Sequence, residues 1–288
     1  MLFTAVGFGV VVAFRNLRSG RGDRRGAARV WGIIFLGGMV IWLLSAEHVV
    51  HGWELRLLTS AVMQYLLAAT VNAALYLAIE PYVRRRWPDS LISWTRLLSG
   101  RFRDSLIASH ILAGFLLFTV TSLMINTANI FAAVPPQMEQ VFTMNSAASF
   151  SAGLLNRAAS SLLIATTWLL LTVLFRVILR RMWIADVVGC IAIALLAGVD
   201  YNSPYAFAIT AGTTSISIYS VFWLLRRFGF LAAVSFWLLM NVLFIPITFT
   251  GWYAGRSMVI LAIPVAIAAW ALWVIVSSQR VTSTTSPT

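Results

Sequence analysis

The chain consists of long apolar runs separated by short, arginine-rich loops, and this alternation limits the possible fold more than any other sequence feature. A helix needs about 20 apolar residues to cross the hydrocarbon core of a bilayer. We therefore predict an all-α protein, a polytopic transmembrane helical bundle with eight full spans. The predicted spans are 30–46, 57–79, 106–133, 154–175, 184–199, 205–225, 230–249 and 258–277.

Composition supports a membrane location, because 60% of the residues are hydrophobic, only 10% are charged and the mean hydropathy is +0.87.

The apolar run 1–14 is short for a span and leads directly into Arg15. A signal peptide carries its charges before the apolar run, not after it. We interpret 1–14 as a partial transmembrane helix, the end of a span in a longer protein. The alternative is a true start with a short, tilted first helix.

Arginine is distributed unequally between the two sets of loops. The chain has 21 Lys plus Arg, and all of them are Arg. Only Arg56, Arg157 and Arg256 fall in one set, which leaves 21 − 3 = 18 in the other. Cytoplasmic loops carry the excess of positive charge. We therefore predict a cytoplasmic location for the loop 15–29, the segment 80–105 and the tail 278–288, and an external location for the loop 133–153. We expect the tail to be disordered. The net charge of +12 therefore indicates orientation in a membrane and gives no indication of nucleic-acid binding.

The segment 80–105 divides the predicted hairpin 30–79 from the predicted six-helix region 106–277. Pro81 should end the preceding helix near Glu80, and a second helix should begin after Pro88. Its spacing is amphipathic, which is typical of a helix in the headgroup layer, with Ser93, Arg96 and Arg103 on the polar face. The apolar stripe, a possible contact for a partner, contains Leu91, Trp94, Leu98 and Phe102.

The same segment should anchor the chain to the anionic inner leaflet of the bilayer, because arginine pairs with lipid phosphate and tryptophan prefers the interface. The predicted anchor residues are Arg84, Arg85, Arg86, Trp87, Trp94, Arg96, Arg101 and Arg103.

Two sequence blocks carry a resemblance to a known family. EPYVRRRWP followed by LISWTRLLSGRFRD, at 80–104, and RNLRSGRGDRRGAAR, at 15–29, resemble the C-terminal membrane module of bacterial membrane-anchored serine/threonine protein kinases. The blocks lie in about the first third of the chain. The resemblance implies a multi-pass protein of the bacterial cytoplasmic (inner) membrane that anchors, and can regulate, a kinase domain in cis or in trans. In the family the block that corresponds to 80–104 continues with an acidic run, whereas here the sequence at 104–110 is DSLIASH.

The chain itself lacks the sequence motifs of a kinase. It contains no Lys to pair with ATP phosphates and no HRD or DFG triplet. It also contains no GxSxG or HExxH motif and no Gly-rich phosphate loop. We therefore predict a non-catalytic chain without a cofactor.

One cluster combines two imidazoles with two carboxylates near the outer end of a predicted helix. Such groups can bind zinc, and a lipid-acting membrane enzyme that uses them is one alternative function. The spacing matches no established metal motif, and His and Glu are common at helix ends. We predict an interfacial helix end at Glu47, His48, His51 and Glu54.

Polar residues recur at helical spacing within two predicted spans, and we expect them to face protein, where they form hydrogen bonds between helices. A polar path in a small-molecule or lipid transporter is the alternative, although no Asp, Glu or Arg lies near the middle of a predicted span. The stripes contain Thr119, Ser122, Asn126 and Asn129 in one span and Thr210, Thr213, Thr214, Ser217 and Ser220 in another.

Overall fold

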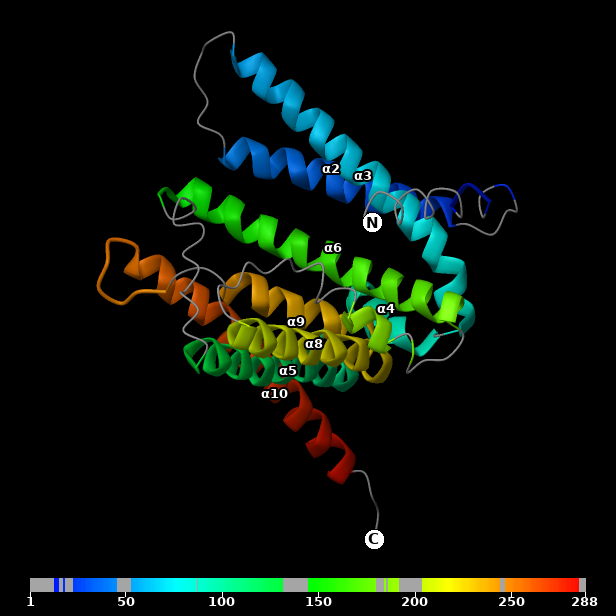
Figure 1. The fold of residues 1–288 in the computed structure, drawn as a ribbon, viewed down its shortest axis with the longest axis vertical. Helices are drawn as coiled ribbons and strands as arrows, with labels where there is room; N and C mark the ends of the chain where they lie inside the picture. Colours follow the sequence, from blue (N-terminus) through cyan, green and yellow to red (C-terminus); the bar gives the residue numbers. More distant parts are fainter. Residues whose placement is uncertain are drawn as a thin grey trace. The chain divides into compact units, whose positions relative to one another are not determined.

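A computed structural model describes residues 13–15, 18, 23–45, 53–86, 88–131, 145–179, 184, 186–191, 204–243 and 247–284 (Figure 1). Within these ranges the regular structure is entirely helical, which confirms the predicted all-α class. The chain divides into two compact units. Unit 1 contains Met1–Pro88 and Gln140–Leu163, and unit 2 contains Asp89–Glu139 and Ile164–Thr288.

Six helices of the described residues are long and apolar enough to cross a membrane, as expected for a multi-pass membrane protein. They are α2 (Arg24–Ser45), α3 (Trp53–Arg86), α5 (Ser105–Phe131), α6 (Ala147–Leu179), α8 (Pro204–Arg227) and α10 (Ala254–Thr284).

The count of eight spans is not confirmed. In place of the predicted span 230–249 the structure has α9 (Phe230–Leu243), which has 14 residues and is shorter than a bilayer requires. Most of the predicted span 184–199 lies outside the described residues, and so does most of the partial span 1–14.

In unit 1, α2 packs against α3. The side chain of Asp23 caps α2, because its Oδ1 accepts the backbone N–H of Gly26 at 2.9 Å. The Tyr76 hydroxyl of α3 donates to Oδ2 of the same carboxylate at 3.2 Å. One side chain therefore both begins α2 and fixes it to α3.

Three sequence-based boundaries are wrong. Helix α3 does not end near Glu80 but continues through Pro81 to Arg86, because a proline removes only one backbone hydrogen bond and the next turn forms its own. Helix α6 begins at Ala147, inside the predicted loop 133–153. Helix α10 continues into the predicted disordered tail as far as Thr284, and the hydroxyl of Ser278 donates to a carbonyl of its own helix.

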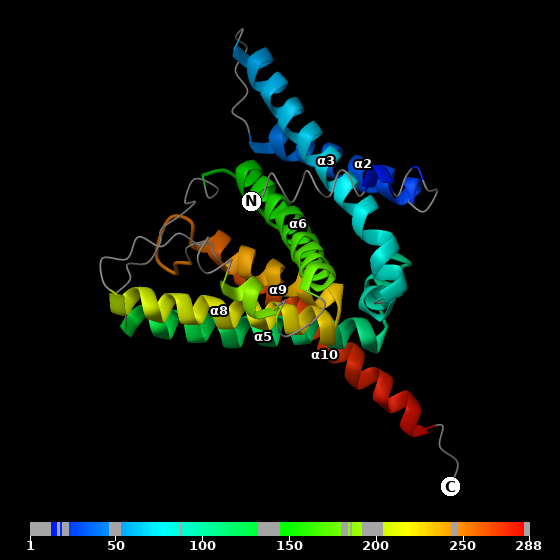
Figure 2. The ribbon, with the colours of Figure 1, turned by 45° about the vertical axis from the view of Figure 1, so that its right-hand side comes forward.

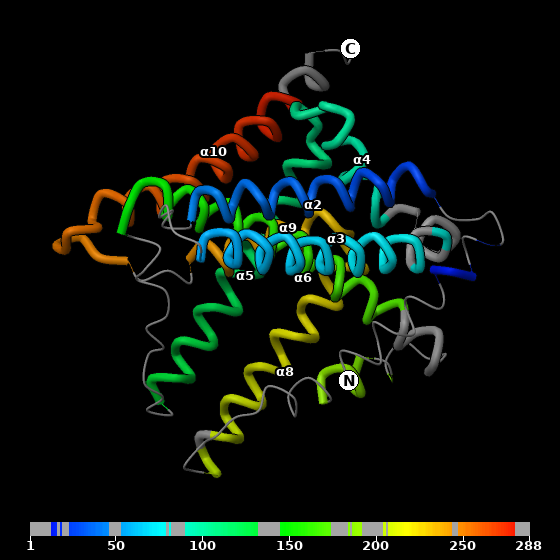
Figure 3. The backbone as a smooth tube through the Cα atoms, turned by 90° about the horizontal axis from the view of Figure 1, so that it is seen from above, coloured from blue at the N-terminus to red at the C-terminus, as the bar shows by residue number. Residues whose placement is uncertain are grey.

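Helix α5 is the central element of unit 2, where it contacts α4 (Ile92–Leu98), α8, α9 and α10. Figures 1 and 2 both show α5 beside α8, and Figure 3 shows the two helices separating toward the C-terminal end of α5. Its N-terminal half supplies the core of the unit, where large side chains of α5 and α9 interdigitate. This core contains Ile107, Ile111, Phe115, Leu231 and Leu239.

Candidate functional site

The segment Asp89–Asp104, which we call the cap, covers the end of unit 2 where α5 begins and α8 turns into α9. It consists of most of a short 3-10 turn (Pro88–Leu91), the helix α4 and the turn that leads into α5. Helix α4 contacts both α5 and α9. The cap contains most of the block at 80–104 that resembles the kinase modules. It is therefore the candidate functional site.

A buried hydrogen bond joins the cap to α5. The Ser93 hydroxyl lies 2.9 Å from Nδ1 of His110, and Ser93 has no exposed surface. The imidazole also meets the ring of Phe228 edge to face, with centroids 5.9 Å apart. Ser93, predicted on the polar face of an interfacial helix, is therefore buried inside the unit, where a partner on α5 satisfies its hydroxyl.

Trp94 fixes the cap to α9. Its ring meets that of Phe230 edge to face, with centroids 5.2 Å apart and planes 89° apart. Trp94 and Leu97 both pack against the α5–α9 core. The tryptophan is thus a packing residue of unit 2 as well as a predicted interfacial anchor.

The predicted apolar stripe is not one helical face, because α4 ends before the stripe does. The backbone N–H of Gly100 donates to Leu97 at 3.0 Å and that of Arg101 donates to Arg96 at 3.1 Å. This pattern, with Gly100 at a φ of +80°, is a Schellman motif that closes the helix. Phe102 follows in the turn. Leu98 and Phe102 remain 69% and 58% exposed.

A close backbone contact seats the start of the cap on the turn between α8 and α9. Gly229 has a φ of +86°, and a Cβ added there would lie 2.4 Å from the carbonyl oxygen of Ser90. Only glycine combines this conformation with this approach. The sequence places a glycine just after Arg227 and Phe228, which is a helix-stop signal, but its contact with Ser90 could not be predicted.

Asp104 connects the end of the cap to α5. Its Oδ1 accepts the backbone N–H of Leu106 at 2.9 Å, and its Oδ2 pairs with the Arg96 guanidinium at 2.8 Å. Burial acts to raise the pKa of this carboxyl, but the hydrogen bonds from Leu106 and Arg96 and the charges of Arg96 and Arg101 outweigh it and lower the pKa below its ordinary value. Asp104 is therefore ionised at neutral pH.

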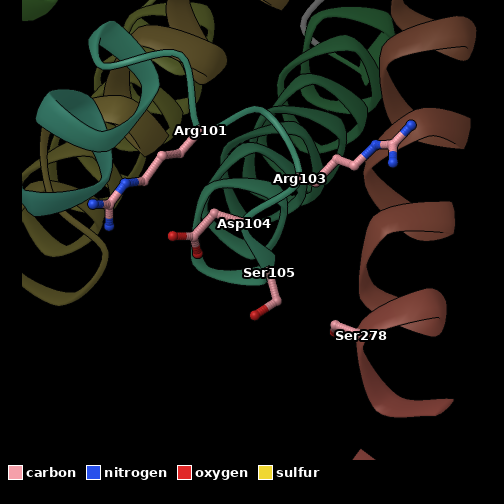
Figure 4. Close-up of a pocket in the computed structure, with 5 residues that line it drawn as sticks. All are labelled: Arg101, Arg103, Asp104, Ser105 and Ser278. Carbon is pink, nitrogen blue, oxygen red and sulfur yellow. The ribbon is translucent and has the colours of Figure 1, made fainter. Parts of the chain in front are cut away.

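Arg96, one of the predicted lipid anchors, thus has an acidic partner within the cap. Two other predicted anchors, Arg101 and Arg103, line an open pocket together with Asp104, Ser105 and Ser278 (Figure 4). The guanidinium carbon of Arg103 lies 5.5 Å from the centroid of the Trp273 ring on α10, in a cation–π contact.

The remaining predicted anchors precede the cap. Arg84, Arg85 and Arg86 form the last turn of α3, and Trp87 lies outside the described residues. Their predicted contacts with lipid remain predictions.

Unit 2 contains a second ion pair, which sequence reasoning missed. The Arg226 guanidinium donates to Asp186 at 2.5 Å, and both side chains are largely buried. Removal of one partner would leave the other charge buried without compensation, which is costly. This pair fixes the short helical piece around Asp186 to the end of α8.

The outer His/Glu cluster falls mainly outside the described residues, which include Glu54 but not Glu47, His48 or His51. Glu54 lies in the first turn of α3. Among the described residues no group of three or more His, Cys, Asp or Glu side chains is placed to hold a metal ion.

Two residues of the polar stripe of α5 form hydrogen bonds within their own helix. Thr119 and Asn126 are exposed, and each donates to a carbonyl of its own helix, that of Phe115 and that of Ser122 respectively. An internal hydrogen bond therefore satisfies each of these two side chains without a second helix, and their predicted contact with protein remains a prediction.

In α8 the polar stripe is divided. Thr213 and Ser220 donate to carbonyls one turn earlier in the helix. The hydroxyl oxygens of Thr210 and Ser217 are buried and have no hydrogen-bond partner. These two residues lie two turns apart and therefore share a face of α8.

Comparisons of the chain with protein-family models, with curated proteins and with solved structures found no match.

Proposed function

We propose that this chain is the non-catalytic membrane module of a bacterial serine/threonine protein kinase. The proposal places the kinase domain upstream in the same protein or on a partner chain, and the module holds it at the cytoplasmic membrane. The observation that carries it is the resemblance of the blocks at 15–29 and 80–104 to such modules. The six candidate spans are consistent with a membrane anchor.

The cap supplies a physical route for regulation. It is joined to α5 by Ser93 and Asp104 and to α9 by Trp94. A protein bound to the cap would therefore act directly on helices of the bundle. Conversely, a rearrangement of those helices would move the surface that the bound protein contacts.

Within the predicted partner-contact stripe, Leu98 and Phe102 are the exposed members. Trp94 is turned into the core of unit 2, so its mutation would disturb packing as well as any partner contact. Burial of a large apolar side chain contributes about 1.5–3 kcal/mol. The pair Leu98 and Phe102 is therefore the sharper probe of a bound kinase domain.

The test joins the module to its kinase domain, in cis or in trans, and measures autophosphorylation in liposomes. We expect the double substitution Leu98→Ala and Phe102→Ala to change the rate severalfold without changing expression or insertion. The matched control is Leu116→Ala with Leu123→Ala, which removes two exposed leucines from the span α5. The control should leave the rate unchanged.

Two results would contradict the proposal. One is a closed reading frame upstream of the Met1 codon together with the absence of a neighbouring kinase gene. The other is movement of a solute by the purified protein in liposomes, which would favour the transporter instead.

A further inference from the structure

A pocket between the end of the cap and α10 lies at the ends of two candidate spans. It has a volume of about 430 Å³ and is lined by Arg101, Arg103, Asp104, Ser105 and Ser278 (Figure 4). One candidate span begins at Ser105 and another ends at Gln279. The pocket is therefore at the depth of lipid headgroups, whichever leaflet it faces.

The charges of the lining favour an anion. Two arginines stand against one carboxylate, Asp104, and both oxygens of that carboxylate are engaged, one by the backbone of Leu106 and the other by Arg96. Repulsion of an incoming anion by Asp104 is therefore offset by the adjacent Arg96. Arginine binds phosphate with paired, charge-assisted hydrogen bonds, and Ser105 adds a hydroxyl donor in the same pocket.

The two arginines are separated in space, and this separation indicates what kind of anion fits. In Figure 4 Arg101 points to one side of the Asp104 turn, and Arg103 points to the other side, toward α10. The contact with Trp273 holds the Arg103 guanidinium on that side. A single phosphate near one arginine would leave the other without an anion, whereas two linked phosphates can engage both.

We propose that this pocket binds the headgroup of an anionic phospholipid that carries two phosphate groups, with one phosphate at Arg101 and the other at Arg103. Basic pockets at the ends of membrane-spanning helices suit such headgroups. The proposal does not depend on the kinase assignment.

Native mass spectrometry of the purified full chain in detergent tests the proposal by titration with three probes. These are diphosphatidylglycerol, phosphatidylglycerol at equal total phosphate, and inorganic phosphate as a competitor. The test variant is Arg101→Gln with Arg103→Gln. The matched control, Arg24→Gln with Arg25→Gln, removes two exposed arginines from the first turn of α2 in unit 1.

We expect the wild-type protein to retain diphosphatidylglycerol in preference to phosphatidylglycerol. The test variant should bind the two-phosphate lipid about 30-fold more weakly, as expected for the loss of two arginine–phosphate contacts. The control should bind it as the wild type does. Unfolding temperatures of both variants should stay close to that of the wild type, because the substituted side chains are exposed and the exposed contact of Arg103 with Trp273 is weak.

Three outcomes would overturn the proposal. Equal losses in the test and control variants would show that binding depends on total charge rather than on the pocket. Equal binding of the two lipids would exclude the two-phosphate geometry. Displacement of the lipid by inorganic phosphate at concentrations similar to that of the lipid would identify a site for free phosphate.

Discussion

Substitution of Gly229 by alanine tests directly whether the cap is seated on the α8–α9 turn. Two independent costs act at this position. An L-residue in the left-handed region costs about 1–2 kcal/mol, and Gly229 has a φ of +86°. The new methyl group would also meet the Ser90 carbonyl oxygen at 2.4 Å and its Cα at 2.9 Å. Because these are backbone atoms, the cap itself would have to move, and overpacking of this kind costs about 1–3 kcal/mol.

Gly229→Ala should therefore lower the free energy of unfolding by about 2–5 kcal/mol. Two other glycines separate the contributions. Gly100 also has a positive φ, of +80°, but a Cβ there would meet nothing within 4 Å, so Gly100→Ala should cost only about 1–2 kcal/mol. Gly212 lies in the interior of α8 with open space around it, so Gly212→Ala should stabilise by about 0.5–1 kcal/mol.

Unfolding of the three variants and the wild type in mixed detergent, followed by circular dichroism, measures these differences. The difference between Gly229→Ala and Gly100→Ala isolates the contact with Ser90. If the two substitutions cost the same, the cap is not seated on the α8–α9 turn, and the reasoning from that contact fails.

Two further predictions concern the cap and the orientation of the chain. Folding lowers the pKa of Asp104 below the value of 3.8 in the unfolded chain. The ionised Asp104 carboxylate therefore stabilises the fold above pH 3.8, and this stabilisation is lost as the pH falls through the lower pKa of the folded state. Asp104→Ala should lower the free energy of unfolding by about 1–2 kcal/mol at neutral pH. In acid titrations the difference in free energy of unfolding between variant and wild type should shrink below pH 3.8. A difference that persists there would contradict a stabilising role for the ionised carboxylate. In a Cys190→Ala background, which removes the single cysteine of the chain, an impermeant thiol reagent applied to intact cells should label a cysteine placed at the exposed Ser146, just before α6, but not one placed at the exposed Ser99. The reverse pattern would invert the predicted topology.

Sequence patterns accounted for the class of protein and for several local features. The apolar runs predicted an all-helical membrane protein, because the bilayer imposes both length and composition on a spanning helix. The run 230–249 did not become a long helix, since α9 ends at Leu243. Hydropathy alone cannot distinguish a lipid-facing span from a shorter helix that is buried in a protein core, and α9 contributes Leu231 and Leu239 to that core.

The amphipathic pattern at 91–102 predicted a helix but not its surroundings. Spacing placed Leu91, Trp94, Leu98 and Phe102 on one face, whereas Gly100 ends the helix before Phe102. A glycine after a helical run is a stop signal, so the sequence itself indicates that the helix ends before Phe102.

The sequence by itself determined that this chain is helical and suited to a membrane, because periodicity, length and charge asymmetry act locally along the chain. Only the tertiary structure decided that Ser93 meets His110, that Ser90 meets Gly229, and that Arg101 and Arg103 share a pocket with Ser278. Each of these contacts joins residues on different elements. Their proximity depends on how α4, α5, α8, α9 and α10 pack together, and no local pattern encodes that packing.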